Sequence, residues 1–368
     1  MSINEIIMYI MVVFMIIGAV DHVIGGKLGL GEQFEEGIMA MGSLALSMVG
    51  IITLAPILAN LLSPIVVPLY SMLGADPSMF ATTILANDMG GFALAQQMAV
   101  DPQAGLFAGT ILGAMMGPTI VFTIPVALGI IEKEDQQFLA TGVLSGMVTI
   151  PIGCLAGGLA AGMPIGMILV NLIPIVIFAV LIMIGLWFAP KGMIKGFTIF
   201  GKGVVAAAIF GLVIGAIQQL VGITVIKGIT PVTEGIEVVG GIALTLSGAF
   251  CLVAVITKVF SKPLLKLGEA MGMNEVAAAG LVATLANSIP MFQMMKDMDQ
   301  RGKIINVAFA VSAAFVLGDH LGFTAGVAKE MIFPMMVGKL VAGITAIFVG
   351  MFMANRVLGK KSNGDKSR

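Results

Sequence analysis

Residues 85–92 read LANDMGGF, and residues 285–292 read LANSIPMF. Both stretches place an Asn, followed by Gly or Pro residues that interrupt helices, inside a run of apolar side chains. Interrupted segments at corresponding places in the two halves of a membrane protein are the usual pointer to the binding site of a transporter. The repeated motif therefore predicts a duplicated membrane transporter.

Further blocks match at nearly the same spacing. Residues 117–119 read GPT where residues 318–320 read GDH, and the Leu-x-Leu-Ser pattern ending at Ser47 recurs at Ser247. The predicted organisation is a first repeat over 1–160, a linker span over 161–190, a second repeat over 191–354 and a disordered tail over 355–368.

Composition fixes the class of protein. Of the 368 residues, 58% are hydrophobic and 11% are charged, and the mean hydropathy is +1.08, whereas soluble domains average about 25% charged residues. We expect an all-α polytopic membrane protein with about nine transmembrane helices and two re-entrant or broken helices; eleven ordinary spans is the alternative. The nine spans are predicted near 5–24, 37–60, 104–130, 138–160, 165–188, 200–222, 236–258, 303–327 and 331–354, and the broken segments near 78–98 and 275–297.

Lys and Arg residues orient the chain, because they are enriched in cytoplasmic loops. Cations flank the second broken segment, whereas 61–77 and 101–103, which flank the first, contain none. The two segments are therefore predicted to enter from opposite faces, as an inverted repeat, with a cytoplasmic C-terminus. The orienting residues are Lys191, Lys195, Lys202, Lys258, Lys262, Lys266, Lys296, Arg301, Lys303, Arg356, Lys360, Lys361, Lys366 and Arg368.

Asn87 and Asn287 are candidate substrate-binding residues. A broken helix survives in hydrocarbon only where it is buried in protein or lines a wet cavity. The break frees backbone groups, and an Asn beside it adds a donor and an acceptor. The alternative is that both side chains only join neighbouring helices through hydrogen bonds.

Asp88, Asp319 and His320 are ionisable residues within apolar segments, and such residues are functional candidates by default. A carboxylate that faces a cavity suits an ammonium group or a coupling ion. Two structural alternatives remain: Asp88 as a local cap at the break, and Asp319 with His320 as a pair that holds two helices in register.

Three further candidates are weaker. Phe92 and Phe292 follow Asp88 and Ser288 by four residues and could present ring faces to a cation, although Phe at helical spacing usually packs. Thr119 could bind a hydroxyl group.

Enzymatic functions are disfavoured. The sequence contains no HExxH, GxSxG or Walker motif, so we expect no catalytic residue, no cofactor, no metal site and no nucleic-acid partner. Transport must then follow a substrate gradient or a co-transported ion.

Four blocks carry a family resemblance: residues 32–37 (EQFEEG), 112–122 (LGAMMGPTIVF), 279–287 (AGLVATLAN) and 313–323 (AAFVLGDHLGF). They resemble the ethanolamine permease (EutH) family of bacterial ethanolamine-utilisation systems over essentially the whole chain. The resemblance implies a multi-pass protein of the bacterial cytoplasmic membrane that imports ethanolamine as a facilitator or as an ion-coupled carrier.

The residue types fit that substrate. Ethanolamine is a primary amine that is protonated near neutral pH, as lysine is with its pKa of about 10.4, so a carboxylate would bind its ammonium group and an Asn its hydroxyl. The sequence leaves open proton or sodium coupling and a homo-oligomeric state. Two alternatives stand: a carrier of another small polar solute such as a nucleoside, and a membrane anchor or sensor for the utilisation machinery.

Overall fold

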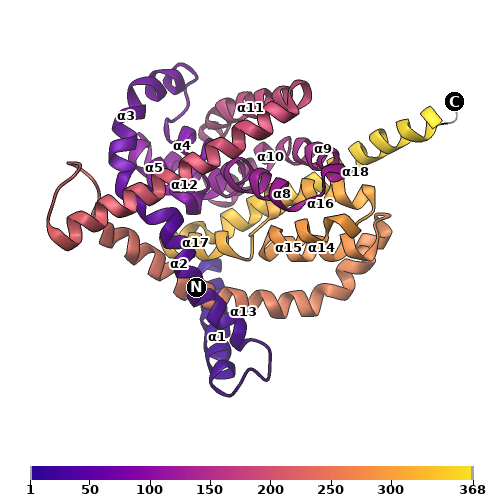
Figure 1. Ribbon diagram of the computed structural model, residues 1–368, viewed down its shortest axis with the longest axis horizontal. Coiled ribbons are helices and arrows are strands. Elements are labelled where there is room, and N and C mark those ends of the chain that lie inside the picture. Colours follow the sequence, from indigo (N-terminus) through magenta and orange to yellow (C-terminus); the bar gives the residue numbers. More distant parts are fainter. Residues whose placement is uncertain (1, 366–368) are drawn as a thin grey trace.

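The computed structural model describes residues 2–365, and the described residues form helices joined by short loops, with no strand among them (Figure 1). This confirms the predicted all-α fold. The helices up to the linker are α1 (Ile3–Val23), α2 (Gly31–Leu44), α3 (Gly50–Met72), α4 (Ser78–Ile84), α5 (Gly91–Met98), α6 (Pro102–Leu106), α7 (Met116–Pro118), α8 (Ile124–Ile130), α9 (Gln136–Met147), α10 (Ile150–Ala160) and α11 (Ile165–Phe188).

Short 3-10 and π-helical turns connect several of these helices. They are η1 (Ala45–Val49), η2 (Asn87–Met89), η3 (Phe107–Ile111), η4 (Leu112–Ala114), η5 (Thr119–Thr123) and η6 (Lys133–Asp135).

Longer helices dominate the rest of the chain. Helix α18 continues to Asp365, past Asn355, where we predicted the start of a disordered tail; residues 366–368 lie outside the described residues. The elements are α12 (Pro190–Val221), α13 (Val232–Ala270), α14 (Glu275–Ala286), α15 (Ser288–Met294), η7 (Met295–Asp297), α16 (Gln300–Ala313), α17 (Asp319–Val327), η8 (Lys329–Met331) and α18 (Ile332–Asp365).

Eight helical stretches in the described chain are long and apolar enough to cross a membrane, and they coincide with eight of the nine predicted spans. The ninth prediction, a continuous span over 303–327, is wrong in detail. That segment is two helices, α16 and α17, separated by residues 314–318.

Hydrogen bonds to α14 stabilise this unpredicted break. Phe315 adopts a positive φ of 65°. Its backbone N–H donates to the Thr284 carbonyl over 3.1 Å, and the Leu317 N–H donates to the Leu285 carbonyl over 2.9 Å. The open end of α14 thus pairs backbone groups that the interruption frees, as burial in an apolar medium requires.

The first broken segment lies where the sequence predicts it. Helix α4 ends at Ile84, Leu85 and Ala86 are extended, and Gly90 takes the left-handed conformation at φ 84° before α5 begins. A side chain on Gly90 would also collide with Ile51, because a Cβ there would lie 2.1 Å from its Cγ2. Glycine is therefore required for both conformation and packing.

The second broken segment differs from the prediction in one respect. The break is at Asn287, which is extended at φ −154° and ψ 136°, whereas Pro290 lies inside α15. Proline is compatible with the first turn of a helix, where the missing N–H has no intrahelical acceptor. The Asn, rather than the Pro, marks the interruption.

Each broken segment packs against a second break in the same half. A Cβ on Gly117 would lie 1.9 Å from the Leu85 carbonyl oxygen, and one on Gly318 would lie 2.2 Å from the Ala286 carbonyl oxygen. Gly117 and Gly318 were matched by sequence, as were the two Leu-Ala-Asn motifs. The two halves thus make matching contacts at these positions, while the duplication and its inverted orientation stay predictions.

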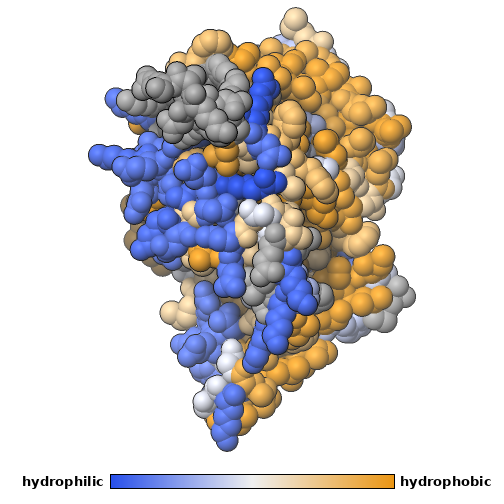
Figure 2. All heavy atoms as spheres, turned by 90° about the vertical axis from the view of Figure 1, so that its right-hand side faces the viewer, coloured by the Kyte–Doolittle hydropathy of each residue, from blue (hydrophilic) through white to orange (hydrophobic). Residues whose placement is uncertain are grey.

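Large apolar side chains cover much of the outer surface. Exposed residues on α1 and α11 include Val13, Ile16, Leu169 and Leu181. In Figure 2 hydrophobic residues gather on one side of the view and hydrophilic ones on the other. A surface of this kind, on helices of spanning length, fits a lipid environment.

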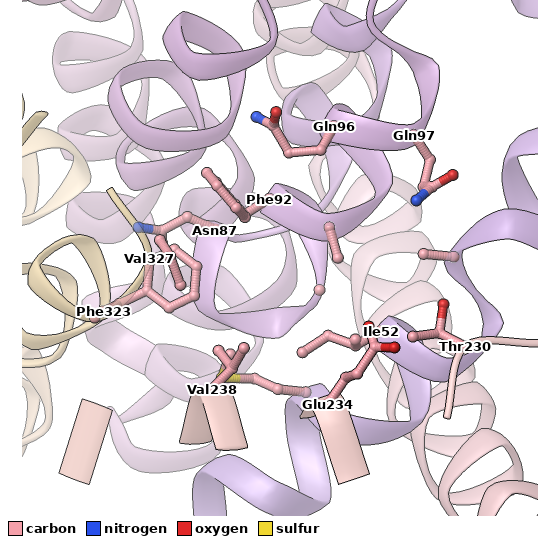
Figure 3. Close-up of a pocket in the computed structure, with 15 residues that line it drawn as sticks. Ile52, Asn87, Phe92, Gln96, Gln97, Thr230, Glu234, Val238, Phe323 and Val327 are labelled. Carbon is pink, nitrogen blue, oxygen red and sulfur yellow. The ribbon is translucent and has the colours of Figure 1, made fainter. Parts of the chain in front are cut away.

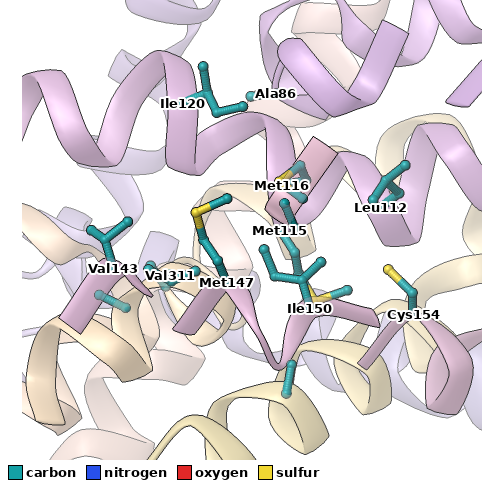
Figure 4. Packing of buried hydrophobic residues seen from close by; sticks show 14 of the residues in the cluster. Ala86, Leu112, Met115, Met116, Ile120, Val143, Met147, Ile150, Cys154 and Val311 are labelled. Carbon is teal, nitrogen blue, oxygen red and sulfur yellow. The ribbon is translucent and has the colours of Figure 1, made fainter. Parts of the chain in front are cut away.

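The interior is packed around α9, α10, α16 and α18, with residues of the 112–120 region against α9 and α10 (Figure 4). A buried ion pair joins α16 to η6, just before α9: Lys303 Nζ lies 2.5 Å from Asp135 Oδ1. The same ammonium group is 5.7 Å from the centre of the Phe138 ring. Charged and apolar contacts thus hold α9 and α16 together.

Candidate functional site

A cavity of about 360 Å³ lies between the first broken segment, α3, α13 and α17 (Figure 3). Both halves of the chain contribute to its wall. The side chains labelled in Figure 3 are Ile52, Asn87, Phe92, Gln96 and Gln97 from the first half and Thr230, Glu234, Val238, Phe323 and Val327 from the second.

Asn87 is the buried polar residue of this wall. The residue is fully buried, yet neither Oδ1 nor Nδ2 of its amide has a hydrogen-bond partner among the described residues. The large majority of buried polar side-chain atoms in proteins are hydrogen-bonded. An amide left unpaired beside a cavity is therefore suited to a polar ligand.

Two aromatic rings close the cavity beside Asn87. Phe92 and Phe323 meet edge to face, with ring centres 5.8 Å apart and planes at 75°. Phe92 was predicted as a site residue, and the structure brings it to the cavity. Phe323 comes from α17 and lies four residues after Asp319, so the aromatic pair joins the two halves of the chain.

Asp88 and Asp319 lie close together. Asp88 follows Asn87 in η2, Asp319 begins α17, and these two elements pack against each other. Both residues are half-buried, and their carboxylates repel one another; the exposed Glu36 adds to the repulsion on Asp319. Two neighbouring carboxylates in an apolar protein create a region that attracts a cation.

His320 is buried, and its Nδ1 has no partner among the described residues. Its ring lies 5.2 Å from that of Phe315, which in turn lies 5.4 Å from Phe122. Phe315, whose backbone has a positive φ, thus contacts the rings of both His320 and Phe122.

Lys339 is a further buried ionisable residue in this region, and it was not predicted from the sequence. This residue of α18 is only 1% exposed, and its ammonium group donates a hydrogen bond to the Ala114 carbonyl, next to the break at Met115. No ion pair joins it to Asp88 among the described residues, and its charge acts on Asp88 and His320 only through space. Lys339 lies within the predicted 331–354 span. An ionisable residue inside a span is a functional candidate, which is the criterion that selected Asp88.

Three other predicted residues have structural partners. The Asn287 Oδ1 accepts a hydrogen bond of 2.9 Å from the Ile289 N–H and caps α15. Phe292 is buried in the main apolar core. The Thr119 hydroxyl is 2.8 Å from the Met115 carbonyl and 3.2 Å from the Val311 carbonyl.

Unpaired polar groups are concentrated around the interrupted helices. Besides Asn87 and His320, buried hydroxyl groups there lack a partner among the described residues; they are Ser78, Thr82, Ser288, Ser312 and Thr324. Because buried polar groups are usually hydrogen-bonded, this set of unpaired groups is suited to binding a polar ligand or water.

Interrupted apolar helices around a cavity, a buried amide and neighbouring carboxylates define the class of the molecule: a polytopic membrane protein with the architecture of a transporter. The chain belongs to the family described as "Ethanolamine utilisation protein, EutH", whose family model matches residues 3–353.

Relatives from several bacteria are similar over nearly their whole length. A Listeria monocytogenes protein named "Probable ethanolamine permease EutH" is 76% identical, covering 98% of this chain and 96% of its own. An Escherichia coli protein of the same name is 54% identical, covering 96% of each chain. A Bacillus subtilis protein named "Uncharacterized protein YxeR" is also 54% identical, over 96% of this chain and 95% of its own. No solved structure matches the chain.

Proposed function

We propose that this protein is a permease that moves ethanolamine, as its ammonium ion, across the bacterial cytoplasmic membrane. Family membership and the printed names of the relatives favour ethanolamine as substrate. They also favour a transporter over an enzyme. The observation that carries the proposal is the unpaired, buried amide of Asn87 at a cavity, in the residue next to Asp88.

The functional groups match the two ends of ethanolamine. The Asn87 amide offers a donor and an acceptor to the hydroxyl group. Asp88 and Asp319 supply negative charge for the ammonium group. The ring faces of Phe92 and Phe323 suit contact with a cation. Of the predicted site residues, we include five in the proposed site: Asn87, Asp88, Asp319, His320 and Phe92. The other three, Asn287, Phe292 and Thr119, have the structural contacts described above and are left out of it.

Formal charge also favours a single positive charge on the substrate. With all three side chains ionised, Asp88 and Asp319 would carry two negative charges and Lys339 one positive charge, which is a net formal charge of −1. One ammonium ion would balance it. A neutral polar solute would leave it unbalanced, which is unfavourable in a low-dielectric site.

Uptake by the purified protein tests the function. Proteoliposomes should accumulate labelled ethanolamine faster than empty liposomes, and excess unlabelled ethanolamine should abolish the signal, whereas excess nucleoside should not. Imposed proton or sodium gradients would reveal ion coupling. Inhibition by the nucleoside would contradict the choice of substrate, and absence of uptake would contradict transport by the isolated protein.

The proposed orientation has its own test. Cysteines introduced at Gln103 and Lys262, in a background without Cys154 and Cys251, should react with an impermeant reagent from opposite faces of the membrane. We expect Gln103 to label from outside and Lys262 from the cytoplasm. Labelling of both from one face would contradict the inverted repeat.

A further inference from the structure

Glu234 is the only ionisable residue among the described residues that line the cavity of about 360 Å³. Neither Asp88 nor Asp319 belongs to that lining. The other polar side chains of the wall are neutral: Asn87, Gln96, Gln97 and Thr230. A cation that enters the cavity therefore meets one negative charge on its wall, and Glu234 carries it.

The backbone at Glu234 is held against the first half of the chain. The Thr230 N–H, in the loop before α13, donates a hydrogen bond of 3.0 Å to the Thr53 carbonyl of α3. Gly235 packs directly on η1, since an added Cβ would lie 2.9 Å from Val49 Cγ1. The start of α13 is thus fixed at the edge of the cavity, and Figure 3 shows the Glu234 side chain on the same side of the view as Thr230.

The cavity has a closed end and an open end. Asn87 is fully buried, whereas Glu234 and Gln97 are exposed. The polar side chains of the wall therefore run from Asn87 inside to a mouth at Glu234 and Gln97. Since the unpaired Asn87 amide lies at the closed end, a polar ligand has to pass the Glu234 carboxylate to reach it.

The predicted orientation turns this mouth outward. Lys202 and Lys258, which mark the cytoplasmic parts of α12 and α13, lie about 30 Å or more along each helix from the loop of residues 222–231 that joins them. Residues 101–103, which follow α5 and Gln97, are predicted to be external as well. Lys227 is the cation nearest to Glu234 in sequence, and no ion pair joins the two among the described residues.

We propose that Glu234 is a capture residue, which draws the ammonium group into the mouth of the cavity and so selects a cation over a neutral solute. The inference rests on the proposed function and adds the residue that selects for positive charge. Ethanolamine has four non-hydrogen atoms and needs about 120 Å³, at about 30 Å³ for each water-sized group. The cavity is larger, so a first contact at the mouth is separate from the later contact with Asn87. A charged entrance raises the local concentration of a cation and speeds its association.

Uptake kinetics in proteoliposomes test the capture step. Glu234→Gln should raise the KM for labelled ethanolamine about fivefold to tenfold and leave the maximal rate within about twofold, because the lost attraction acts on entry. Glu234→Asp keeps the charge, and its KM should stay within about threefold of wild type. Competition by neutral 1,2-ethanediol should be equal in wild type and Glu234→Gln. Equal weakening of the amine and the diol would show an effect on cavity shape and would overturn the proposal.

Salt gives a second signature of the charge. Raising the ionic strength from about 0.01 M to about 1 M shortens the Debye length from about 30 Å to about 3 Å. The wild-type KM should then rise about fivefold, while that of Glu234→Gln should change by less than about twofold. The same salt dependence in both proteins would contradict capture by Glu234.

Glu237→Gln is the matched control. Glu237 lies one turn further along α13, is exposed, and does not line the cavity. Its substitution removes the same charge and should leave the KM within about twofold of wild type. An equal rise in KM for Glu237→Gln, or an unchanged KM in a well-folded Glu234→Gln protein, would overturn the proposal.

A thiol reporter separates failure of this inference from failure of the proposed function. Val238 lines the cavity one turn after Glu234, so Val238→Cys is introduced without Cys154 and Cys251. Its reaction rates with trimethylammonium-ethyl and hydroxyethyl methanethiosulfonate are compared, and the cationic-to-neutral ratio should fall about threefold or more when Glu234→Gln is added. A purely structural role in the first turn of α13 would change thermal stability and leave this ratio unaltered. If wild type takes up no ethanolamine but the ratio falls, the substrate is wrong and the charged mouth stands; an unchanged ratio rejects capture by Glu234 itself.

Discussion

The two Leu-Ala-Asn breaks are similar in sequence but differ in structure. At the first break the Asn87 amide is buried, unpaired and at the wall of a cavity. At the second, Asn287 is half-buried and uses its Oδ1 to cap α15. The same residue type at matched positions is thus left unpaired at a cavity in one half and completes a helix end in the other.

The two breaks pack in a similar way, so the different hydrogen bonding of their Asn side chains does not result from different backbone packing. Both halves bring a glycine against the backbone of the broken segment, at Gly117 and at Gly318. The backbone arrangement is therefore common to the two halves, while polar side chains near it differ. Similar backbone packing and different side-chain roles can occur together, because a break frees backbone groups whichever side chain lies beside it.

The largest effect is expected where the halves are most alike. In Gly117→Ala and Gly318→Ala the new Cβ would lie 1.9 Å and 2.2 Å from carbonyl oxygens of the backbone. Because backbone cannot yield as a flexible side chain does, each change should cost about 3 kcal/mol of unfolding free energy, at the upper end of the range for overpacking. Thermal unfolding and size-exclusion profiles in detergent would measure this loss.

Gly129→Ala in α8 is the matched control, because no heavy atom lies within 4 Å of its added Cβ. It should change the unfolding free energy by no more than about 1 kcal/mol. If Gly318→Ala folded normally while Gly117→Ala did not, the two breaks would not share a packing scheme.

A smaller effect should separate the two Asn residues. Asn87→Ala should weaken ethanolamine binding about tenfold to a hundredfold with little change in thermal stability, because the lost hydrogen bonds are to the ligand. Asn287→Ala should leave affinity near wild type and lower the unfolding free energy by about 1 kcal/mol, as loss of a helix cap does. Binding and melting measured on the same preparations would compare them.

The smallest change is the control at the second break. Asn287→Ser retains a capping oxygen and should alter the unfolding free energy by less than about 0.5 kcal/mol. Equal losses of affinity in Asn87→Ala and Asn287→Ala would show that both side chains contact the substrate, and the contrast between the breaks would disappear.

Sequence patterns predicted the long apolar helices and the two Asn breaks, because hydrophobic length and the Gly pair at Gly90 act locally. They did not predict the interruption at residues 314–318. No proline lies there, and the break is stabilised by carbonyls of α14 that come close only in the folded protein. Pro290 was predicted to interrupt a helix, but it lies in the first turn of α15, where proline is tolerated.

The candidate site was predictable in part. Asn87, Asp88 and Asp319 were predicted as candidates because polar residues in apolar segments are few. Lys339 was not predicted, although it satisfies the same criterion. The distinction between Asn87 and Asn287 could not be made from a repeated motif. It depends on whether the Ile289 N–H reaches the side chain, which only the geometry of the break decides.

Lys303 and Asp135 restrict how the molecule can rearrange. Sliding α16 past the start of α9 would pull the two groups apart and leave unpaired charges in an apolar interior, at a cost of about 3–5 kcal/mol for breaking such a pair. The Phe138 ring beside the ammonium group adds to that resistance. Helices α9 and α16 should therefore move as one rigid unit, and any hinge movement that opened the cavity would have to occur in other parts of the chain.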